Sequence, residues 1–353
     1  MRVAILANLK KNAPTWEGMS ADQWDDLDSE ETIESISKAL EAGGHRTTFL
    51  EGDATLFENL HRLKPDICFN LCEGHFGDGR EAQIPAMLEM LRIPYSGSKV
   101  LTLALALDKP MTKRVLTYHE LPTPPFQVFE RVDEPLDRSL TFPLFIKPSR
   151  EGTGMGVSGE SILRDEADLR EQLPRLFERY NQPALVEHFV EGREVTVGVV
   201  GNLTGPAARR VPEDEHAERV FSGLHLFPTL EVNMEKYPDE EAGVYTSRMK
   251  VDWAHEFHYF CPAPLPKEKI DELNFLTAAV FRVTGCLDVA RVDFRLDQHD
   301  NDKPYILEIN PLPGLHPGYS DLCLEAEADG WTYEELVNRI LNAAIKRYRL
   351  NAS

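Results

Sequence analysis

Two stretches near the end of the chain carry oxygen-bearing side chains at a strand-like spacing. Asp293 lies in ARVDFRL, and Glu308 and Asn310 lie in YILEIN. Side chains alternate along a strand, so Glu308 and Asn310 share one face, and a neighbouring strand can bring Asp293 beside them. Two carboxylates and an amide oxygen suit a Mg²⁺ ion that keeps waters and shares nucleotide phosphates. Three polar residues on an exposed sheet face are an equal alternative on this evidence alone.

The surroundings of these residues favour a site. Arg291 shares the face of Asp293 and adds a permanent cation, which is useful beside a transferred phosphoryl group or an oxyanion. The second stretch runs into NPLPGLHPGYSDL, a Pro/Gly-rich loop of the kind at which α/β proteins hold ligands. Four polar groups that converge from two apolar strands therefore predict a metal and phosphoryl site.

A second candidate site begins at a lysine that ends an apolar run. Lys147 closes FPLFIK, and the following REGTGMGVS carries Gly152, Gly154 and Gly156 at every second position. A point cation followed by backbone N–H groups free of bulky side chains suits phosphate oxygens. The GxxxxGK[ST] loop is absent, and a glycine-rich hairpin turn with an incidental lysine is the alternative.

The elements that must position these residues follow from hydrophobic patterning. Strands near 2–7, 46–51 and 65–71 alternate with helices near 29–43 and 81–91, which predicts a small open parallel sheet. The acidic segment DQWDDLDSEE should cap and enter the first helix, and a solvated face is favoured over a functional charge run there.

The rest of the chain predicts a second α/β region. Two helical stretches follow Leu101, interrupted at Pro110. The charged stretch 203–250 is expected to be loop-rich and able to move over a site. Further strands are expected near 126–130, 142–147 and 184–188 and in LDVARVDFRL and PYILEIN, with helices over 165–180, after CPAPLP and in WTYEELVNRILNAAIKRYR.

Composition limits the class of protein. A chain of 353 residues fits two or three packed subdomains. A net charge of −21 without a Lys/Arg cluster argues against nucleic-acid binding. No apolar run approaches the roughly 20 residues of a membrane span, and the first residues lack a secretory signal, so we expect a cytoplasmic protein with small-molecule partners. A homodimer is compatible with these features. The five cysteines are expected to be buried free thiols.

Five motifs in order resemble those of ATP-grasp ligases, and most of all the D-alanine–D-alanine ligase family. They span nearly the whole chain: GHFGDGREAQIPAMLEMLRIPYSGS, ALALDKPMTKRVL, FIKPSREGTGMGVS, LVEHFVEGREVTVGVVGN, and ARVDFRLD with YILEINPLPG. The resemblance implies an α/β domain over 1–108 with an open parallel sheet, and then a two-subdomain ATP-grasp fold of α+β type. Its central subdomain would cover 109–190 and its C-terminal subdomain 191–353.

The resemblance also implies roles for individual residues. Lys109 and Lys147 would hold the ATP phosphates under the loop of Gly152, Thr153, Gly154 and Gly156. The adenosine would be bound by Glu187, the backbone of His188 and Val190, Phe189 and Glu194. Asp293, Glu308 and Asn310 would bind two Mg²⁺ ions, with Mn²⁺ as an alternative, and Arg291 would stabilise the tetrahedral intermediate. Lys250 resembles a lysine of the family's mobile loop that reaches the terminal phosphate.

Departures from the family pattern fall on the substrate side. The N-terminal segment lacks the family's serine and glutamate, and Glu73 stands where a histidine is usual. Glu73 either binds a substrate amine or is a surface-loop glutamate. Gly314 is retained, and Ser320 lies about one position from the family's carboxylate-binding serine.

These departures leave several functions to compare. The implied activity is an ATP-dependent carboxylate–amine ligase for amino acids or small peptides, acting through an acyl phosphate. The alternatives are a genuine D-alanine–D-alanine ligase, a non-catalytic ATP-binding regulatory module, and an ATP-grasp enzyme that carboxylates or phosphorylates another metabolite.

Overall fold

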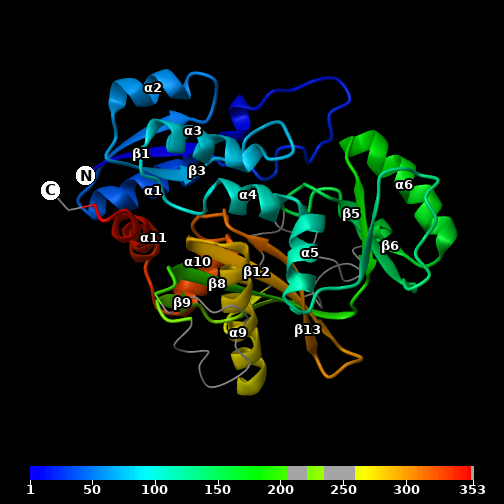
Figure 1. Cartoon of the computed structure of the whole chain (residues 1–353). Helices are drawn as coiled ribbons and strands as arrows, with labels where there is room; N and C mark the ends of the chain where they lie inside the picture. Colours follow the sequence, from blue (N-terminus) through cyan, green and yellow to red (C-terminus); the bar gives the residue numbers. More distant parts are fainter. Residues whose placement is uncertain (205–220, 234–258, 351–353) are drawn as a thin grey trace.

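The computed structural model describes residues 1–204, 221–233 and 259–350, and Lys250 lies outside them. Within this part, the strands form three sheets (Figure 1). The first belongs to the N-terminal region, the second to the central region at the right of the view, and the third to the C-terminal region below. The expected α/β class, with an open parallel sheet ahead of two further sheet-containing regions, is confirmed.

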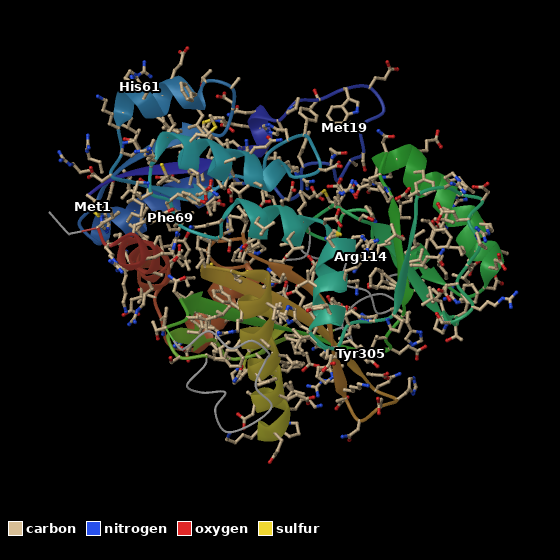
Figure 2. The ribbon with its side chains drawn as sticks, viewed as in Figure 1. Met1, Met19, His61, Phe69, Arg114 and Tyr305 are labelled. Carbon is tan, nitrogen blue, oxygen red and sulfur yellow. The ribbon has the colours of Figure 1, made fainter. Side chains whose placement is uncertain are left out.

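The first sheet has strand order β2–β1–β3, and both pairings are parallel, as the alternation predicted. Val3 and Ile5 of β1 pack toward helices α1 and α11, whereas Ala4 and Leu6 pack toward α2 and α3. Phe69 of β3 lies on the α11 side (Figure 2). The elements are β1 Arg2–Ala7, η1 Lys10–Asn12, α1 Glu30–Ala42, β2 Arg46–Glu51, α2 Leu56–Leu63, β3 Ile67–Leu71, η2 Arg80–Ala82 and α3 Gln83–Leu91.

Two helices lead from the first sheet to the second. Helix α4 covers Val100–Leu107 and α5 covers Lys109–Tyr118. The break falls at Asp108, whose side chain accepts a hydrogen bond from the Met111 N–H. The expected interruption at Pro110 is therefore wrong by two residues, because proline is tolerated in the first turn of a helix.

The second sheet is antiparallel, with order β4–β7–β5–β6, and α6 covers one of its faces through Leu169, Leu173 and Leu176. Strand β5 of this sheet begins at Leu144, two residues later than expected, and still places Lys147 next to its end. The elements are β4 Phe126–Phe129, β5 Leu144–Pro148, η3 Gly159–Ser161, β6 Ile162–Leu163, α6 Glu166–Tyr180 and β7 Ala184–His188.

The third sheet is antiparallel, with order β11–β10–β8–β12–β13, and β9 also pairs with β8. Helix α9 packs on it through an apolar core. Strands β9 and β10 fall in the stretch 203–250 that we expected to be loop-rich, so that expectation is wrong for these two short segments, because both pair with β8. Residues 205–220 and 234–250 of the stretch lie outside the described residues. The elements are β8 Gly192–Gly201, β9 Leu224–Leu226, β10 Leu230–Val232, β11 Tyr259–Phe260, α9 Lys267–Thr284, β12 Asp288–Asp297, β13 Lys303–Asn310, α10 Asp321–Ala328 and α11 Tyr333–Tyr348.

Two simpler expectations concern membranes and thiols. Among the helices that the structure describes, none combines the length and the apolar character needed to cross a membrane. All five cysteines are free thiols, and all but the half-buried Cys261 are buried, as expected.

Candidate active site

Strand register brings the candidate metal ligands together. In the β12–β13 ladder Asp293 faces Glu308 and Arg291 faces Asn310. On the other side of β12, Asp293 faces Thr196 of β8. The prediction that these side chains meet on one sheet face is confirmed, because alternation along β12 and β13 places them there.

Asp293 is the centre of a hydrogen-bonded group. Asn310 Nδ2 donates to Asp293 Oδ2 at 2.9 Å, and Thr196 Oγ1 donates to Asp293 Oδ1 at 2.7 Å. Arg291 donates to the same carboxylate through Nε and a terminal nitrogen at 2.8 and 2.9 Å, and lies 3.4 Å from Asp321. Burial alone would lower the pKa of Arg291, but Asp293 and Asp321 raise it well above its usual value. Arg291 is therefore a fixed cation whose position two carboxylates determine.

Lys147 belongs to a buried group of two lysines and one glutamate. Its Nζ lies 2.8 Å from Glu187 Oε1, and Lys113 Nζ lies 2.5 Å from Glu187 Oε2. Burial would raise the pKa of Glu187, but the two ammonium groups lower it to about 2. Burial lowers the pKa of Lys113 to about 8, because the repulsion from Lys147 offsets part of the attraction to Glu187. The cluster has a surplus positive charge at the end of β5.

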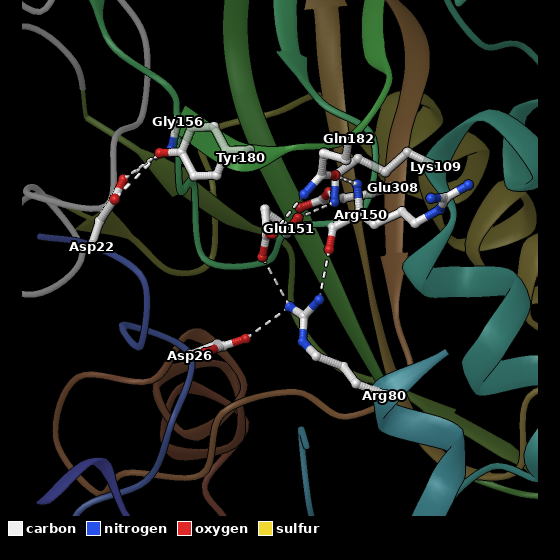
Figure 3. Close-up of polar contacts among 10 residues, drawn as sticks. All are labelled: Asp22, Asp26, Arg80, Lys109, Arg150, Glu151, Gly156, Tyr180, Gln182 and Glu308. Carbon is white, nitrogen blue, oxygen red and sulfur yellow. Dashed lines mark hydrogen bonds and ion pairs between the residues drawn. The ribbon is translucent and has the colours of Figure 1, made fainter. Parts of the chain in front are cut away.

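Lys109 connects three elements of the candidate site. Its Nζ lies 3.1 Å from Glu308 Oε2 and donates to the carbonyl oxygen of Glu151 at 2.5 Å (Figure 3). One lysine at the start of α5 thus contacts both a candidate metal ligand on β13 and the first residues of the glycine loop. Such a position places a positive charge between the metal face and the loop.

The strand end after β7 forms an aromatic and charged wall. Phe189 stacks on Phe145 with ring centroids 5.9 Å apart, and the Arg295 guanidinium lies 5.4 Å from the Phe189 ring. Arg295 also contacts Glu194 at 3.2 Å. These residues and His188 and Val190 line one cavity, so the residues expected to bind adenosine are brought together.

The glycine loop has a backbone that requires its small residues. Gly156 has a φ of 74°, and a Cβ there would lie 2.7 Å from Pro148 Cγ. Its N–H donates to Asp22 Oδ2 at 3.0 Å. Thr153 also lies in the left-handed region, at a φ of 51°, which is strained for a β-branched residue. The loop is held in an unusual conformation next to the candidate metal face.

The acidic segment before α1 departs from its expected solvated face. Ser29 does cap α1, as predicted, through a hydrogen bond from the Thr32 N–H. Asp22, however, contacts Arg179 at 2.8 Å and accepts a hydrogen bond from Tyr180 at 2.9 Å. The prediction of a solvated face is therefore wrong for Asp22, because the central region covers this side chain.

Arg80 joins the same segment to the glycine loop at a second point. It lies 3.1 Å from both Asp26 and Glu151, and it donates to the carbonyl oxygen of Arg150 at 2.8 Å (Figure 3). The side chains of Arg80, Asp26 and Glu151 are each less than a tenth exposed. The acidic segment thus packs against the region that bears Lys147.

Two cavities meet at Glu308. The nucleotide-side cavity, named here for its expected occupant, is lined by Lys109, Lys147, Glu151, Gly154, Met155, Glu187, His188, Phe189, Val190, Glu194, Asp293, Arg295 and Glu308, among others. The second, the acidic cavity, has a volume of about 270 Å³ and is lined by Asp25, Asp26, Asp28, Glu73, Thr153, Arg291, Glu308, Asn310, Gly314, Ser320 and Asp321, among others. Glu73 is therefore a partly buried residue of the cavity wall, which favours a substrate role over the surface-loop alternative, and that role stays a prediction.

Several residues of the site were not predicted, although some carried a signal. Lys113 lies one helical turn after Lys109, and Arg295 continues the alternation of Arg291 and Asp293. Both signals were available in the sequence. Arg80 and Asp321 had no comparable pattern, since their partners come from distant parts of the chain.

Comparison with known proteins identifies the family of this chain. The family model described as "D-ala D-ala ligase C-terminus" matches residues 115–221 and 227–342. The chain belongs to the D-alanine–D-alanine ligase family. It is an ATP-dependent ligase that forms carbon–nitrogen bonds.

Relatives in this family align over most of the chain. A D-alanine–D-alanine ligase of Syntrophotalea carbinolica is 33% identical over 338 residues, 96% of this chain and 97% of that protein. The uncharacterized protein y4sG of Sinorhizobium fredii is 33% identical over 323 residues, 89% of this chain and 88% of that protein. The crystal structure of a Bacillus anthracis D-alanine–D-alanine ligase complexed with ATP superposes with a TM-score of 0.72 at 21% identity, over 99% of both chains, and shows the shared fold.

Proposed function

We propose that this ligase family member activates a substrate carboxylate with ATP and joins it to an amine of an amino acid or small peptide. The observation that carries this proposal is the position of Glu308, which lines both cavities. A phosphoryl group from the nucleotide-side cavity and a carboxylate from the acidic cavity would meet there, beside Arg291 and Asp293. Phosphoryl transfer depends mainly on such positioning and on charge neutralisation.

The nucleotide-side cavity supports ATP binding in its charges and its shape. Lys109 and Lys147 would contact phosphate oxygens, with the backbone of Gly152, Gly154 and Gly156 above them and Thr153 next to the reacting phosphate. Since Glu187 has a second lysine partner in Lys113, Lys147 can turn toward phosphate without leaving that carboxylate unpaired. Glu187, the backbone of His188 and Val190, Phe189 and Glu194 would surround the adenosine.

The donor set of the metal face fits Mg²⁺. Asp293 and Glu308 supply carboxylates and Asn310 an amide oxygen, and hard oxygen donors of this kind bind Mg²⁺ together with waters and phosphates. Bound there, the ion supplies neutralisation of charge on the transferred phosphoryl group. We propose two ions, for which Mn²⁺ could substitute.

The chain's own side chains then position both steps. The substrate carboxylate attacks the terminal phosphorus to form an acyl phosphate and ADP. The amine next attacks the acyl carbon, loses a proton, and expels phosphate to leave the amide. Arg291, held by Asp293 and Asp321, would stabilise the oxyanion of the tetrahedral intermediate.

The residues of the acidic cavity support an amino-acid substrate less specifically than the nucleotide-side cavity supports ATP. Gly314 and Ser320 would bind a carboxylate in the acidic cavity and Glu73 an amine, and Lys250 would reach the terminal phosphate from outside the described residues. A homodimer and a cytoplasmic location stay predictions. A non-catalytic module is disfavoured, since Arg291 and all three proposed metal ligands are retained.

Phosphate release with D-alanine as sole substrate, beside a panel of other amino acids and dipeptides, tests the proposal. We expect ADP, phosphate and a product of the summed mass less water from at least one pair, with D-alanine alone a poor pair. A change in specific polar contacts often changes discrimination by orders of magnitude. If D-alanine gives the highest kcat/KM, the chain is a D-alanine–D-alanine ligase, and if no pair yields product, the ligase proposal fails.

A further inference from the structure

The acidic cavity combines two kinds of residues. Arg291, Glu308 and Asn310 belong to the candidate metal face. Carboxylates from two separate segments also line it, Asp26 and Asp28 before α1 and Glu73 after β3. Asp26 and Glu73 line a smaller cavity together with Glu308 and Asn310, so a substrate whose carboxylate reaches the metal face would lie beside these acids.

These three acids have too few cations among the residues that the structure describes. Asp26 pairs with Arg80 through Oδ2, but its Oδ1 is buried without a hydrogen-bond partner, and the whole side chain is only 7% exposed. The side chains of Asp28 and Glu73 have no hydrogen bond or ion pair to any other described residue. The neighbouring Asp25 is different, because Lys10 neutralises it at 2.7 Å.

The raised pKa values of Asp28 and Glu73 indicate the electrostatic cost of this arrangement. Burial, and then the charge of Asp26, raise the pKa of Asp28 to about 7. Burial and the charges of Glu81 and Asp26 raise the pKa of Glu73 well above its usual value. A buried carboxylate without a cation is costly, and a positively charged ligand would remove much of that cost.

The charge count indicates more than one missing cation. Of the cations that line the cavity, Lys10 is paired with Asp25, and Arg291 is paired with Asp293 and Asp321. The three carboxylates are left with the guanidinium of Arg80 behind Asp26, which also serves Glu151. The α-ammonium of an ordinary amino acid would supply one positive charge and leave a deficit. A second ammonium on the same substrate would balance it.

We propose that the acidic cavity selects a substrate with a cationic side chain, such as a diamino carboxylic acid or a peptide that contains one. This inference rests on the proposed ligase function and names its substrate class. The carboxylate of the substrate lies toward Arg291 and the metal face, and its side-chain ammonium lies among Asp26, Asp28 and Glu73.

The test compares amino acids of equal length with and without the terminal ammonium. Lysine against norleucine and ornithine against norvaline, in both enantiomers, are assayed with the full chain at saturating Mg-ATP by phosphate release and product mass. We expect the ammonium-bearing member to have a kcat/KM at least about tenfold higher. Equal or greater activity with the neutral partner, in both pairs, overturns the proposal.

Variants locate the selectivity. Asp28→Asn and Glu73→Gln should each reduce the lysine-to-norleucine ratio about tenfold, mainly through KM for lysine. Asp133→Asn and Glu58→Gln, at exposed positions far from the cavity, should leave the ratio unchanged. An unchanged ratio in both cavity variants contradicts the assignment.

A binding measurement separates this inference from the ligase proposal. Calorimetry with lysine and norleucine is done with a non-hydrolysable ATP analogue and Mg²⁺ present. Lysine binding that Asp28→Asn weakens supports the cationic site even if no pair turns over. Turnover with neutral amino acids only keeps the ligase and overturns the cationic site, as does failure of every cationic amino acid to bind. Saturable Mg²⁺ binding without nucleotide, lost in Asp28→Asn, assigns the acids to a metal and also overturns it.

Discussion

The two cavities of this ligase treat charge in opposite ways. On the nucleotide side, each cation discussed above has a carboxylate partner within the protein: Lys109 with Glu308, Lys147 and Lys113 with Glu187, and Arg295 with Glu194. In the acidic cavity, Asp28 and Glu73 have no such partner among the described residues. In the first region each of these cations has a carboxylate partner before any ligand binds, whereas the second region depends on its ligand for a cation.

This difference indicates which cavity determines the substrate specificity. A paired cluster keeps its geometry in the free protein, so that the proposed phosphate-binding groups are already in place. An unbalanced cluster stores an unfavourable interaction that only a ligand of the right charge relieves. The nucleotide side is therefore expected to determine the reaction, and the acidic cavity to determine its substrate.

Glu308→Gln should have the largest effect, because Glu308 serves both cavities. We expect kcat to fall about a hundredfold or more through loss of an anionic ligand at the metal face, with the melting temperature within a few degrees of the parent. Steady-state phosphate release and thermal melting measure both quantities. Glu58→Gln on the exposed face of α2 is the matched control, and near-normal turnover by Glu308→Gln at ordinary Mg²⁺ would sink the metal assignment.

Glu187→Gln tests the balance of the nucleotide side. Two buried ammonium groups would lose their only carboxylate in the cluster, so the free energy of unfolding should fall by about 3 kcal/mol. The pKa of Glu187 falls from 4.5 to about 2 on folding, so its contribution is complete above pH 4.5 and is lost as pH falls toward 2. Urea unfolding at pH 7 and pH 3 should show a smaller difference between parent and variant at pH 3. Glu178→Gln on α6 is the control, and a pH-independent difference contradicts the ion-pair explanation.

Asp28→Asn tests the imbalance of the acidic cavity and should increase stability. The folded-state pKa of about 7 lies above the ordinary value of 3.8, so the native state loses stability as pH rises from about 4 to 7. Removing the charge should raise the free energy of unfolding at pH 8 by about 1 to 2 kcal/mol, with little change at pH 4. Chemical denaturation at the two pH values measures this gain. Equal stability of parent and variant at pH 8 would mean that Asp28 is already balanced.

Asp22→Asn should have the smallest effect, since asparagine retains an oxygen that can accept from the Gly156 N–H. The charge-assisted contact with Arg179 is lost, at a cost of about 1 kcal/mol. Hydrogen exchange across residues 150–157 should become about fivefold faster and should slow again when Mg-ATP is added. Asp137→Asn in a distant exposed turn is the control. Unchanged exchange in Asp22→Asn would show that the acidic segment does not restrain the loop.

Much of the nucleotide side could be predicted from local patterns. Asp293, Glu308 and Asn310 share a face because strand side chains alternate, and the pairing of two strands close in sequence needs no distant information. The lysine at the end of β5 and the glycines after it follow the same local logic. Prediction failed for the acidic segment before α1, because acidic side chains of the same composition can lie in solvent or against another part of the protein.

The sequence by itself determined most of the elements, the parallel first sheet and the shared face of Asp293, Glu308 and Asn310, because each depends on periodicity within short stretches. Only the tertiary structure decided that Asp22 holds the N–H of Gly156, 134 residues away, and that Asp26, Asp28 and Glu73 enclose one cavity. The physical reason is that a carboxylate is stable in water on any exposed face. Whether it is solvated, paired or buried without a partner depends on which distant segment covers it. The charges near it in sequence do not indicate which segment that is.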